Sequence, residues 1–260
     1  MPVRRNTLKK IFDTVPTLYD SQRPGYPVAL IKDILSLSHI PAHGRILEIG
    51  CGTGQATKPF ADRGYQMTCL DIGTNLAAMA RRKFRSYANV TVVAKSFESW
   101  NPKTTKYHLA IAATSFHWLV PAIRYTKVSR LLQPHGSLAV FSNGHIRRDE
   151  GFFAEVQNIY RKIAPSRCQA KSDVPEPPGT EPGRDLFEKP ITKRYPWDEQ
   201  YTAEEYIALL GTYSDHISLP KPEREELFRA ITDLIDTNYQ GVVLKHYESL
   251  LEIRRLIADC

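Results

Sequence analysis

The chain contains 260 residues, of which 42% are hydrophobic and 24% are charged, and its formal net charge at pH 7 is +7. This composition is ordinary for a globular protein, and the length fits one large α/β domain or one domain with an insertion. No apolar run is long enough to span a membrane, and the N-terminal residues lack the apolar segment of a secretory signal, so neither a membrane-spanning nor a secreted protein is expected.

The positions of the cysteine, histidine and basic residues indicate which compartment, metals and partners to expect. The cysteines form no C-x-x-C pair, and neither cysteine nor histidine shows metal-ligand spacing, so we expect reduced thiols, a cytoplasmic protein and no metal. Cys51 stands between two glycines and is expected to be a small packing residue, with a reactive thiol as the alternative. The basic residues occur in small groups on elements that need not share a face, which disfavours a nucleic-acid partner.

Residues 6–40 precede the first predicted strand. Four apolar residues at helical spacing predict a helix after Pro27: Leu30, Ile31, Ile34 and Leu35. The segment before it, from Tyr19 to Pro27, reads Y-D-S-Q-R-P-G-Y-P. The hydroxyl of Tyr19 and the guanidinium of Arg23 both donate hydrogen bonds and therefore suit a carboxylate ligand. The alternative is a proline-rich loop whose aromatic side chains pack on the core.

The stretch from Ile46 to Thr57, I-L-E-I-G-C-G-T-G-Q-A-T, is the strongest signal in the sequence. Its apolar start predicts a buried parallel strand, its glycines allow a tight turn close to a ligand, and a helix is expected behind them over residues 55–63. The free N–H groups at a helix start favour a carboxylate or phosphate. The dinucleotide pattern G-x-G-x-x-G is not matched, because Gln55 stands at the third glycine position, which counts against NAD or FAD.

The string Glu48-x-Gly50-x-Gly52-x-Gly54 resembles motif I of the class I S-adenosylmethionine-dependent methyltransferases. A glycine turn that binds nothing is the alternative. The resemblance implies S-adenosylmethionine as the cofactor, and it places the residues of this string beside it: Glu48, Gly50, Gly52 and Gly54. The upstream Y-D-x-x-R-P-x-Y-P segment resembles the opening of small-molecule methyltransferases of the trans-aconitate type. That likeness implies that Tyr19 and Arg23 lie over the methionine end of the cofactor.

A second strand is expected over residues 65–70, and Asp71 ends it. Asp71 follows Gly50 by 21 residues (71 − 50 = 21), close to the interval at which nucleotide-binding α/β folds place an acid on the ribose. A carboxylate can accept two hydrogen bonds from a vicinal diol, so Asp71 is the candidate for the adenosine ribose, with Ile72 against the adenine. The alternative is that Asp71 caps the helix expected over residues 75–87.

The third strand is expected over residues 90–94, and the turn Lys95–Glu98 follows it. The resemblance implies that this turn contacts the adenine. Many family members carry aspartate where Ser96 stands, so either Ser96 or Glu98 is left to bind the exocyclic amine, and Phe97 would supply an apolar wall. A loop without function is the alternative.

The fourth strand is expected over residues 107–113 and leads to Phe116-His117-Trp118. The carboxyl ends of central parallel strands hold the reactive groups of open α/β sheets. The resemblance places Ala113 beside the cofactor, and the F-H-W-L run resembles the H-W pair of the trans-aconitate type. His117 is the candidate general base for a hydroxyl acceptor, with a wall-lining role as the alternative. The candidates for the acceptor side are Tyr26, His117, Trp118 and Tyr213.

The sequence after Trp118 continues the alternation of helices and strands that is typical of an α/β fold. The elements expected next are a helix over 122–132, a turn over 131–136, a fifth strand over 137–141, a helix over 151–164 and a proline-rich loop over 172–184. After these we expect a strand over 187–197, a helix opened by a capping box at Thr202, a helix through residues 227–235 and a last strand from 241 to about 254. Together with the resemblance, they predict a Rossmann-like, seven-stranded, mostly parallel sheet with an antiparallel last strand, helices on both faces and a helical insertion between strands five and six.

We therefore divide the chain into an N-terminal cap over the cofactor (1–40), an S-adenosylmethionine-binding core (41–145) and an acceptor-side insertion with the closing strands of the same domain (146–260). The expected activity is methyl transfer to a small-molecule acceptor, at a carboxylate or hydroxyl rather than an amine, by a monomer or homodimer that is not membrane-bound. The absence of an N-P-P-[YF] run after strand four counts against methylation of nucleic-acid bases. A nucleic-acid or protein methyltransferase, a cofactor-binding protein without activity and a dinucleotide oxidoreductase are the alternatives.

Overall fold

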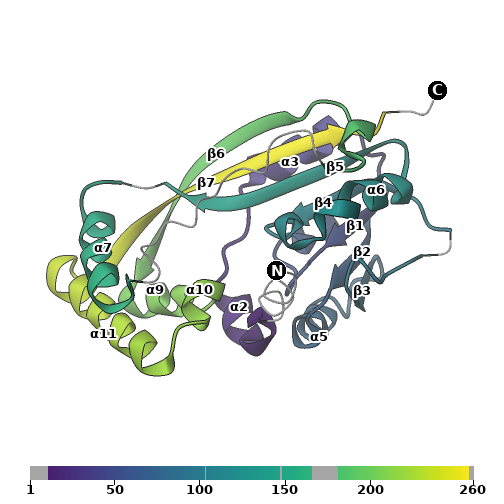
Figure 1. Ribbon diagram of the computed structural model, residues 1–260. Coiled ribbons are helices and arrows are strands. Elements are labelled where there is room, and N and C mark those ends of the chain that lie inside the picture. Colours follow the sequence, from purple (N-terminus) through teal and green to yellow (C-terminus); the bar gives the residue numbers. More distant parts are fainter. Residues whose placement is uncertain (1–10, 103, 147, 166–180, 258–260) are drawn as a thin grey trace.

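The computed structural model describes residues 11–102, 104–146, 148–165 and 181–257, and it contains one twisted seven-stranded sheet surrounded by helices (Figure 1). The strand order is β3-β2-β1-β4-β5-β7-β6. The strands are β1 (Arg45–Ile49), β2 (Gln66–Asp71), β3 (Val90–Ala94), β4 (Tyr107–Ala113), β5 (Leu132–His145), β6 (Ile191–Thr202) and β7 (Val242–Arg255). Neighbours from β3 to β5 are parallel, whereas β7 is antiparallel to both β5 and β6, which confirms the predicted fold class.

The helices connect these strands and cover the sheet. Before β1 come η1 (Phe12–Thr14), α2 (Pro16–Gln22) and α3 (Val28–Ser38); between β1 and β5 come α4 (Thr57–Ala61), α5 (Thr74–Lys83), η2 (Phe116–Trp118) and α6 (Pro121–Leu131). After β5 come α7 (Phe152–Ile163), η3 (Arg184–Leu186), α9 (Ala203–Leu210), α10 (Ser214–Ile217) and α11 (Lys221–Asn238). No helix in the described ranges is long and apolar enough to cross a membrane.

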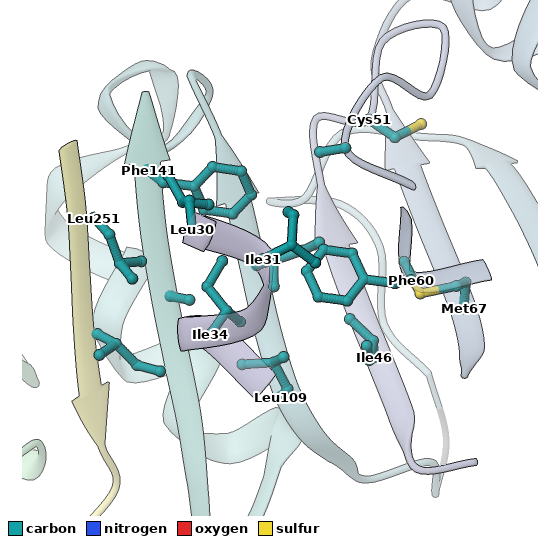
Figure 2. Packing of buried hydrophobic residues seen from close by; sticks show 14 of the residues in the cluster. Leu30, Ile31, Ile34, Ile46, Cys51, Phe60, Met67, Leu109, Phe141 and Leu251 are labelled. Atoms are coloured by element: carbon teal, nitrogen blue, oxygen red, sulfur yellow. The ribbon is translucent and has the colours of Figure 1, made fainter. Parts of the chain in front are cut away.

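The two faces of the sheet carry separate apolar clusters, because successive strand residues point to opposite faces. On one face, Leu30, Ile31 and Ile34 of α3 are buried over the central strands; Figure 2 shows them beside Leu109 and Phe141. On the other face, α6 contributes Tyr125, Val128 and Leu131. Burying one Leu or Ile side chain contributes about 1.5–3 kcal/mol, so removing Ile31 alone would cost a large part of the net stability of a domain.

A third apolar cluster joins helices α7, α9 and α11 to one end of β6 and β7. Figure 1 shows these helices, with α10, grouped beyond that end of the sheet. Among the described helices, α7 and the short η3 lie between β5 and β6, whereas α9, α10 and α11 lie between β6 and β7. The predicted insertion between strands five and six is therefore divided between two connections.

Several predicted boundaries are also corrected. The expected turn over 131–136 is mostly strand, because Leu132 is buried and pairs with Tyr107 at the start of β5. The helix after the glycines is shorter than expected, since Gly54 has a φ of +94° and α4 begins only at Thr57. Phe187 makes only an isolated bridge to Leu256, and β6 itself begins at Ile191. The proline-rich stretch 172–184 lies mostly outside the described residues.

Two predicted details are confirmed. The third and fourth strands have the expected bounds. The capping box at Thr202 is also present, because its hydroxyl accepts a hydrogen bond from the Glu205 N–H at 3.2 Å, and the Glu205 carboxylate accepts one from the Thr202 N–H at 2.9 Å.

Candidate active site

The glycine turn follows β1 at the point where the strand order reverses between β1 and β4. In open α/β sheets, ligands bind in the crevice at such a point. The N–H groups of Gly50 and Cys51 both donate to the Leu70 carbonyl of β2, at 2.8 and 2.9 Å, so the turn bends over the neighbouring strand. Gly52 has a φ of +56°, and a Cβ there would lie 3.3 Å from the Tyr19 ring. Glycine is thus required for both the backbone conformation and the close approach of Tyr19.

Asp71 lies at the carboxyl end of β2 and is held by two backbone donors. Its Oδ2 accepts a hydrogen bond from the Gly52 N–H at 2.8 Å, and its Oδ1 accepts one from the Gly73 N–H at 2.7 Å. Burial raises the pKa of Asp71 to about 6, although the two backbone hydrogen bonds lower it. Each carboxylate oxygen has a further lone pair, and the side chain is 8% exposed on a cavity wall. It can therefore accept hydrogen bonds from a diol in the cavity.

The N-terminus of α5 is capped by Asp13 from η1. Its Oδ1 accepts from the N–H groups of Asn75 and Leu76, at 2.8 and 2.9 Å. Asp71 therefore does not cap this helix alone. It accepts from the N–H of Gly73, just before the helix, whereas Asp13 accepts from the N–H groups of the first helical turn. The same contacts attach the N-terminal segment to α5.

These elements border one cavity of about 1600 Å³. It extends from the carboxyl ends of the first strands, past η2, to helices α7, α9 and α10. The predicted site residues that line it are Tyr19, Arg23, Gly50, Gly52, Asp71, Ile72, Ser96, Phe97, Ala113, His117, Trp118 and Tyr213. Residues from six separate parts of the sequence thus line one cavity.

Three predicted site residues do not line this cavity. Gly54 packs under Phe84, because a Cβ there would lie 2.3 Å from the Phe84 ring. The hydroxyl of Tyr26 lies 2.9 Å from the Thr114 hydroxyl, and Tyr26 lines a separate cavity of about 550 Å³. Glu48 is fully buried, and its Oε2 accepts a hydrogen bond from the Thr57 hydroxyl at 2.6 Å.

Glu48 also carries a buried oxygen, Oε1, without a hydrogen-bond partner among the described residues. Burial raises the pKa of this carboxyl to about 7, although its hydrogen bond with Thr57 lowers it. β1 alternates between the two faces of the sheet, so Glu48 points toward α4, beneath the glycine turn, and not into the cavity.

Aromatic rings and one arginine form the N-terminal wall. Phe12 packs edge-on against Tyr19 and Trp118, with ring centroids 5.9 and 6.1 Å apart. The guanidinium of Arg23 lies 5.1 Å from the Tyr19 ring and 4.5 Å from the Tyr213 ring. It donates one hydrogen bond, to the Thr212 carbonyl at 2.7 Å, and its buried Nε has no partner among the described residues. Arg23 therefore has donors left for an anionic ligand.

The turn after β3 and the η2 segment also line the cavity. The Ser96 hydroxyl lies 2.9 Å from the Ser99 hydroxyl and accepts from the Ser99 N–H at 3.2 Å, so it also stabilises its own turn. Phe97 is buried, and Glu98 accepts from the Val120 N–H at 3.3 Å. His117 is exposed, and its ring centroid lies 4.9 Å from that of Trp118.

The far end of the cavity holds polar residues that the sequence did not single out. The Tyr160 hydroxyl lies 2.8 Å from His216 Nε2, and His216 Nδ1 lies 3.0 Å from the Asp215 carboxylate. Lys245 of β7 is also in this wall. Its position could have been found, since Val243, Lys245 and Tyr247 occupy alternate positions of a predicted strand and so share one face.

Comparison with known proteins agrees with this geometry. Residues 46–136 match the model of a methyltransferase domain family. An uncharacterised methyltransferase-like protein of Schizosaccharomyces pombe is 27% identical over 234 residues, which cover 88% of this chain and 87% of that protein. The chain is an S-adenosylmethionine-dependent methyltransferase. The family implies S-adenosylmethionine as its methyl donor.

Solved structures share the fold of this methyltransferase. A structure described as a type II methyltransferase from Anaeromyxobacter dehalogenans superposes with a TM-score of 0.67 at 22% identity, covering 91% of this chain and 99% of that one. Phosphoethanolamine N-methyltransferase 2 of Haemonchus contortus, solved with S-adenosylhomocysteine, superposes with a TM-score of 0.54 at 14% identity, covering 95% of this chain and 58% of that one. These likenesses concern the fold.

Proposed function

We propose that this methyltransferase transfers the methyl group of S-adenosylmethionine to a small-molecule acceptor, at a carboxylate or hydroxyl oxygen. The observation that carries the proposal is the extent of the cavity. One space of about 1600 Å³ runs from the glycine turn and Asp71 to a second region under α7, α9 and α10. Cavities that bind drug-sized ligands span about 300–1,000 Å³, so this one has room for the methyl donor and an acceptor together.

The donor half of the cavity fits the parts of S-adenosylmethionine. Asp71 has lone pairs for the two ribose hydroxyls, and Ile72 and Phe97 supply apolar contacts for the adenine, with Ser96 or Glu98 for its amine. Arg23 and Tyr19 offer donors for the methionine carboxylate, since Arg23 has N–H groups without partners at the cavity. Glu48 is assigned an indirect role, because it supports the glycine turn from beneath through Thr57.

The bound donor supplies a methyl group on a positively charged sulfur, and the protein positions the acceptor and excludes water. The acceptor atom has to be held about 3 Å from the methyl carbon, in line with the bond that breaks. Aromatic faces stabilise a nearby cation by about 0.5–2 kcal/mol each. Tyr19 and Trp118 both line the cavity and both pack against Phe12, and they are the candidates for this contact.

The need for a base depends on the acceptor. A hydroxyl must lose its proton, and His117 is the sequence-predicted group on the wall that can take it. A carboxylate is already ionised at neutral pH and needs no base, so His117 would then only line the wall. Exposure of His117 to solvent is compatible with either role.

Incubation with S-adenosylmethionine carrying a tritiated methyl group tests the proposal. The acceptors offered are a set of small carboxylic acids and alcohols and, separately, total RNA and total protein. We expect label in small, extractable products, identified as methyl esters or ethers by mass spectrometry. Label found only in precipitated RNA or protein would refute a small-molecule acceptor.

A further inference from the structure

Lys245 is a buried lysine on the wall of the acceptor half of the cavity. It lies on β7 between Val243 and Tyr247, on the face of the strand that is turned away from solvent. It is 3% exposed and lines the same cavity as Asp71 and Arg23. Lysine is almost never buried to this extent unless it is paired.

Three aromatic rings surround the ammonium group. Nζ lies 5.1 Å from the ring centroid of Tyr247, 5.4 Å from that of Phe153 and 5.7 Å from that of Tyr206. These rings come from β7, α7 and α9, so the lysine sits where the sheet meets two helices. Aromatic faces attract a cation, but they do not neutralise its charge.

Among the described residues, no carboxylate forms an ion pair with Lys245. Glu199, opposite Lys245 in the pairing of β6 with β7, is exposed, and within the described part of the chain no ion pair joins the two. Asp215 of α10, on the same cavity, contacts His216, and Asp149 is exposed. The charge of Arg23, from the end of α2, adds repulsion, and burial together with this repulsion lowers the pKa of Lys245 to about 7. The other titratable or charged groups that line this half of the cavity include His145, the exposed Arg148, Tyr160, Tyr206, Tyr213, His216 and His246.

A buried cation that lines a cavity and lacks a counter-charge is suited to an anionic ligand. We propose that Lys245 binds a carboxylate of the methyl acceptor, and that the acceptor is a carboxylic acid with an apolar body. The apolar body follows from the lining of this half, which includes Phe153, Val156, Leu210 and Leu219. One carboxylate on the acceptor is enough for this contact, because Lys245 is the one cation that we assign to the acceptor and Arg23 is assigned to the methionine carboxylate of the donor. This inference rests on the proposed function for the identity of the cavity as donor and acceptor site.

The test uses matched pairs of acids and neutral amides as probes. The thermal midpoint of the full chain, saturated with S-adenosylhomocysteine, is measured with acetate, octanoate and 4-phenylbutyrate, and with the corresponding amides. We expect the acids, and not the amides, to raise the midpoint, since only a ligand of the folded state does so. We expect octanoate and 4-phenylbutyrate to act at lower concentration than acetate. Equal effects of acids and amides, no effect of any acid, or an effect of inorganic phosphate alone would overturn the proposal.

Variants of Lys245 give the second measurement. Lys245→Met keeps a side chain of similar length without charge, and we expect it to weaken octanoate binding by roughly tenfold to a hundredfold, the range for a lost hydrogen bond to a charged group. Lys245→Arg should restore most of the affinity. Lys221→Met, at an α11 position that is 76% exposed, is the control and should bind as the wild type does. Unchanged octanoate affinity in Lys245→Met would overturn the proposal.

The two proposals can fail separately. Calorimetry with S-adenosylhomocysteine alone reports the donor half, and we expect Lys245→Met to bind it as the wild type does. If S-adenosylhomocysteine binds but the acids do not, only the assignment of Lys245 fails. If S-adenosylhomocysteine does not bind, the proposed function fails, and the acid and amide series without it still decides whether Lys245 binds a carboxylate. Should Lys245→Met not fold, the acid and amide series on the wild type remains decisive.

Discussion

The carboxylate of Asp71 accepts a hydrogen bond from the backbone N–H of Gly52 at 2.8 Å. This contact links the acid at the end of β2 to the glycine turn after β1, although 19 residues separate them in the chain. The two features that would hold the sugar and the amino-acid part of the donor are therefore joined directly by a hydrogen bond. A change in either should alter the other.

The first prediction concerns Asp71→Asn. Asparagine keeps one acceptor oxygen but loses the charge and the second acceptor, so one contact to the ribose or to Gly52 is lost. We expect S-adenosylhomocysteine to bind roughly tenfold to a hundredfold more weakly by calorimetry. Asp62→Asn is the matched control, because Asp62 pairs with Lys58 away from the cavity and should leave affinity unchanged. Equal affinity in the two variants would show that Asp71 does not contact the ligand.

The second prediction concerns the pH dependence of stability through Glu48. Burial raises the folded-state pKa of Glu48 from 4.5 to about 7, so the folded protein favours the neutral carboxyl. The contribution of Glu48 to the free energy of unfolding is therefore fully present below the pKa of the unfolded state, and it is lost as pH rises through the pKa of the folded state. Glu48→Gln is neutral at all pH values, and its free energy of unfolding relative to the wild type should rise by about 2 kcal/mol between pH 5 and pH 8.

Urea unfolding of the ligand-free protein at the two pH values measures this difference. The exposed Glu226→Gln serves as the control and should show no such trend. A difference between Glu48→Gln and the wild type that does not change with pH would show that Glu48 is ionised in the folded protein throughout this range.

The third prediction concerns His117→Gln. With a carboxylate acceptor no proton is removed, so we expect kcat to change by less than about threefold, with a larger effect on the KM of the acceptor. The pH profile of kcat should lack an imidazole step. A loss in kcat of about a hundredfold together with a changed pH profile would instead identify a hydroxyl acceptor that uses His117 as its base.

The fourth prediction concerns the pH dependence of acid binding at Lys245. The cationic form binds a carboxylate, and the pKa of Lys245 in the unliganded cavity is about 7. Between about pH 5.5 and 6.5, where octanoate is ionised and Lys245 is charged, the Kd should be nearly constant, and above pH 7 it should approach a rise of about tenfold per pH unit. Lys245→Arg should remove this rise, because arginine stays charged throughout. Calorimetry at several pH values measures both, and a pH-independent Kd in the wild type would contradict the assignment.

The sequence predicted the parts of the fold that local pattern determines. The apolar runs at Val90–Ala94 and Tyr107–Ala113 became strands with the expected bounds, and Thr202 with Glu205 formed the expected cap. Which residues pair between neighbouring strands was harder to predict from the sequence. Leu132 extends β5 because it pairs with Tyr107, a contact between residues that lie 25 apart in the chain (132 − 107 = 25).

The site residues were predictable where a sequence motif stands at the end of a predicted strand, as Gly52 and Asp71 do. Glu48 belongs to the same motif, yet the alternation of β1 directs it to Thr57 and away from the cavity. Tyr26 lies close to Arg23 in the sequence, but its hydroxyl contacts Thr114 instead. The alternation of β7 places Lys245 on one face with Val243 and Tyr247, but it does not predict where α7, α9 and α10 lie around that face.

Calorimetric titration of S-adenosylhomocysteine into the full chain tests the central claim most directly, with NADH titrated in parallel. We expect saturable binding of one S-adenosylhomocysteine per chain and no binding of NADH. Absence of measurable binding for both S-adenosylhomocysteine and S-adenosylmethionine would contradict a methyl-donor site at the glycine turn and Asp71.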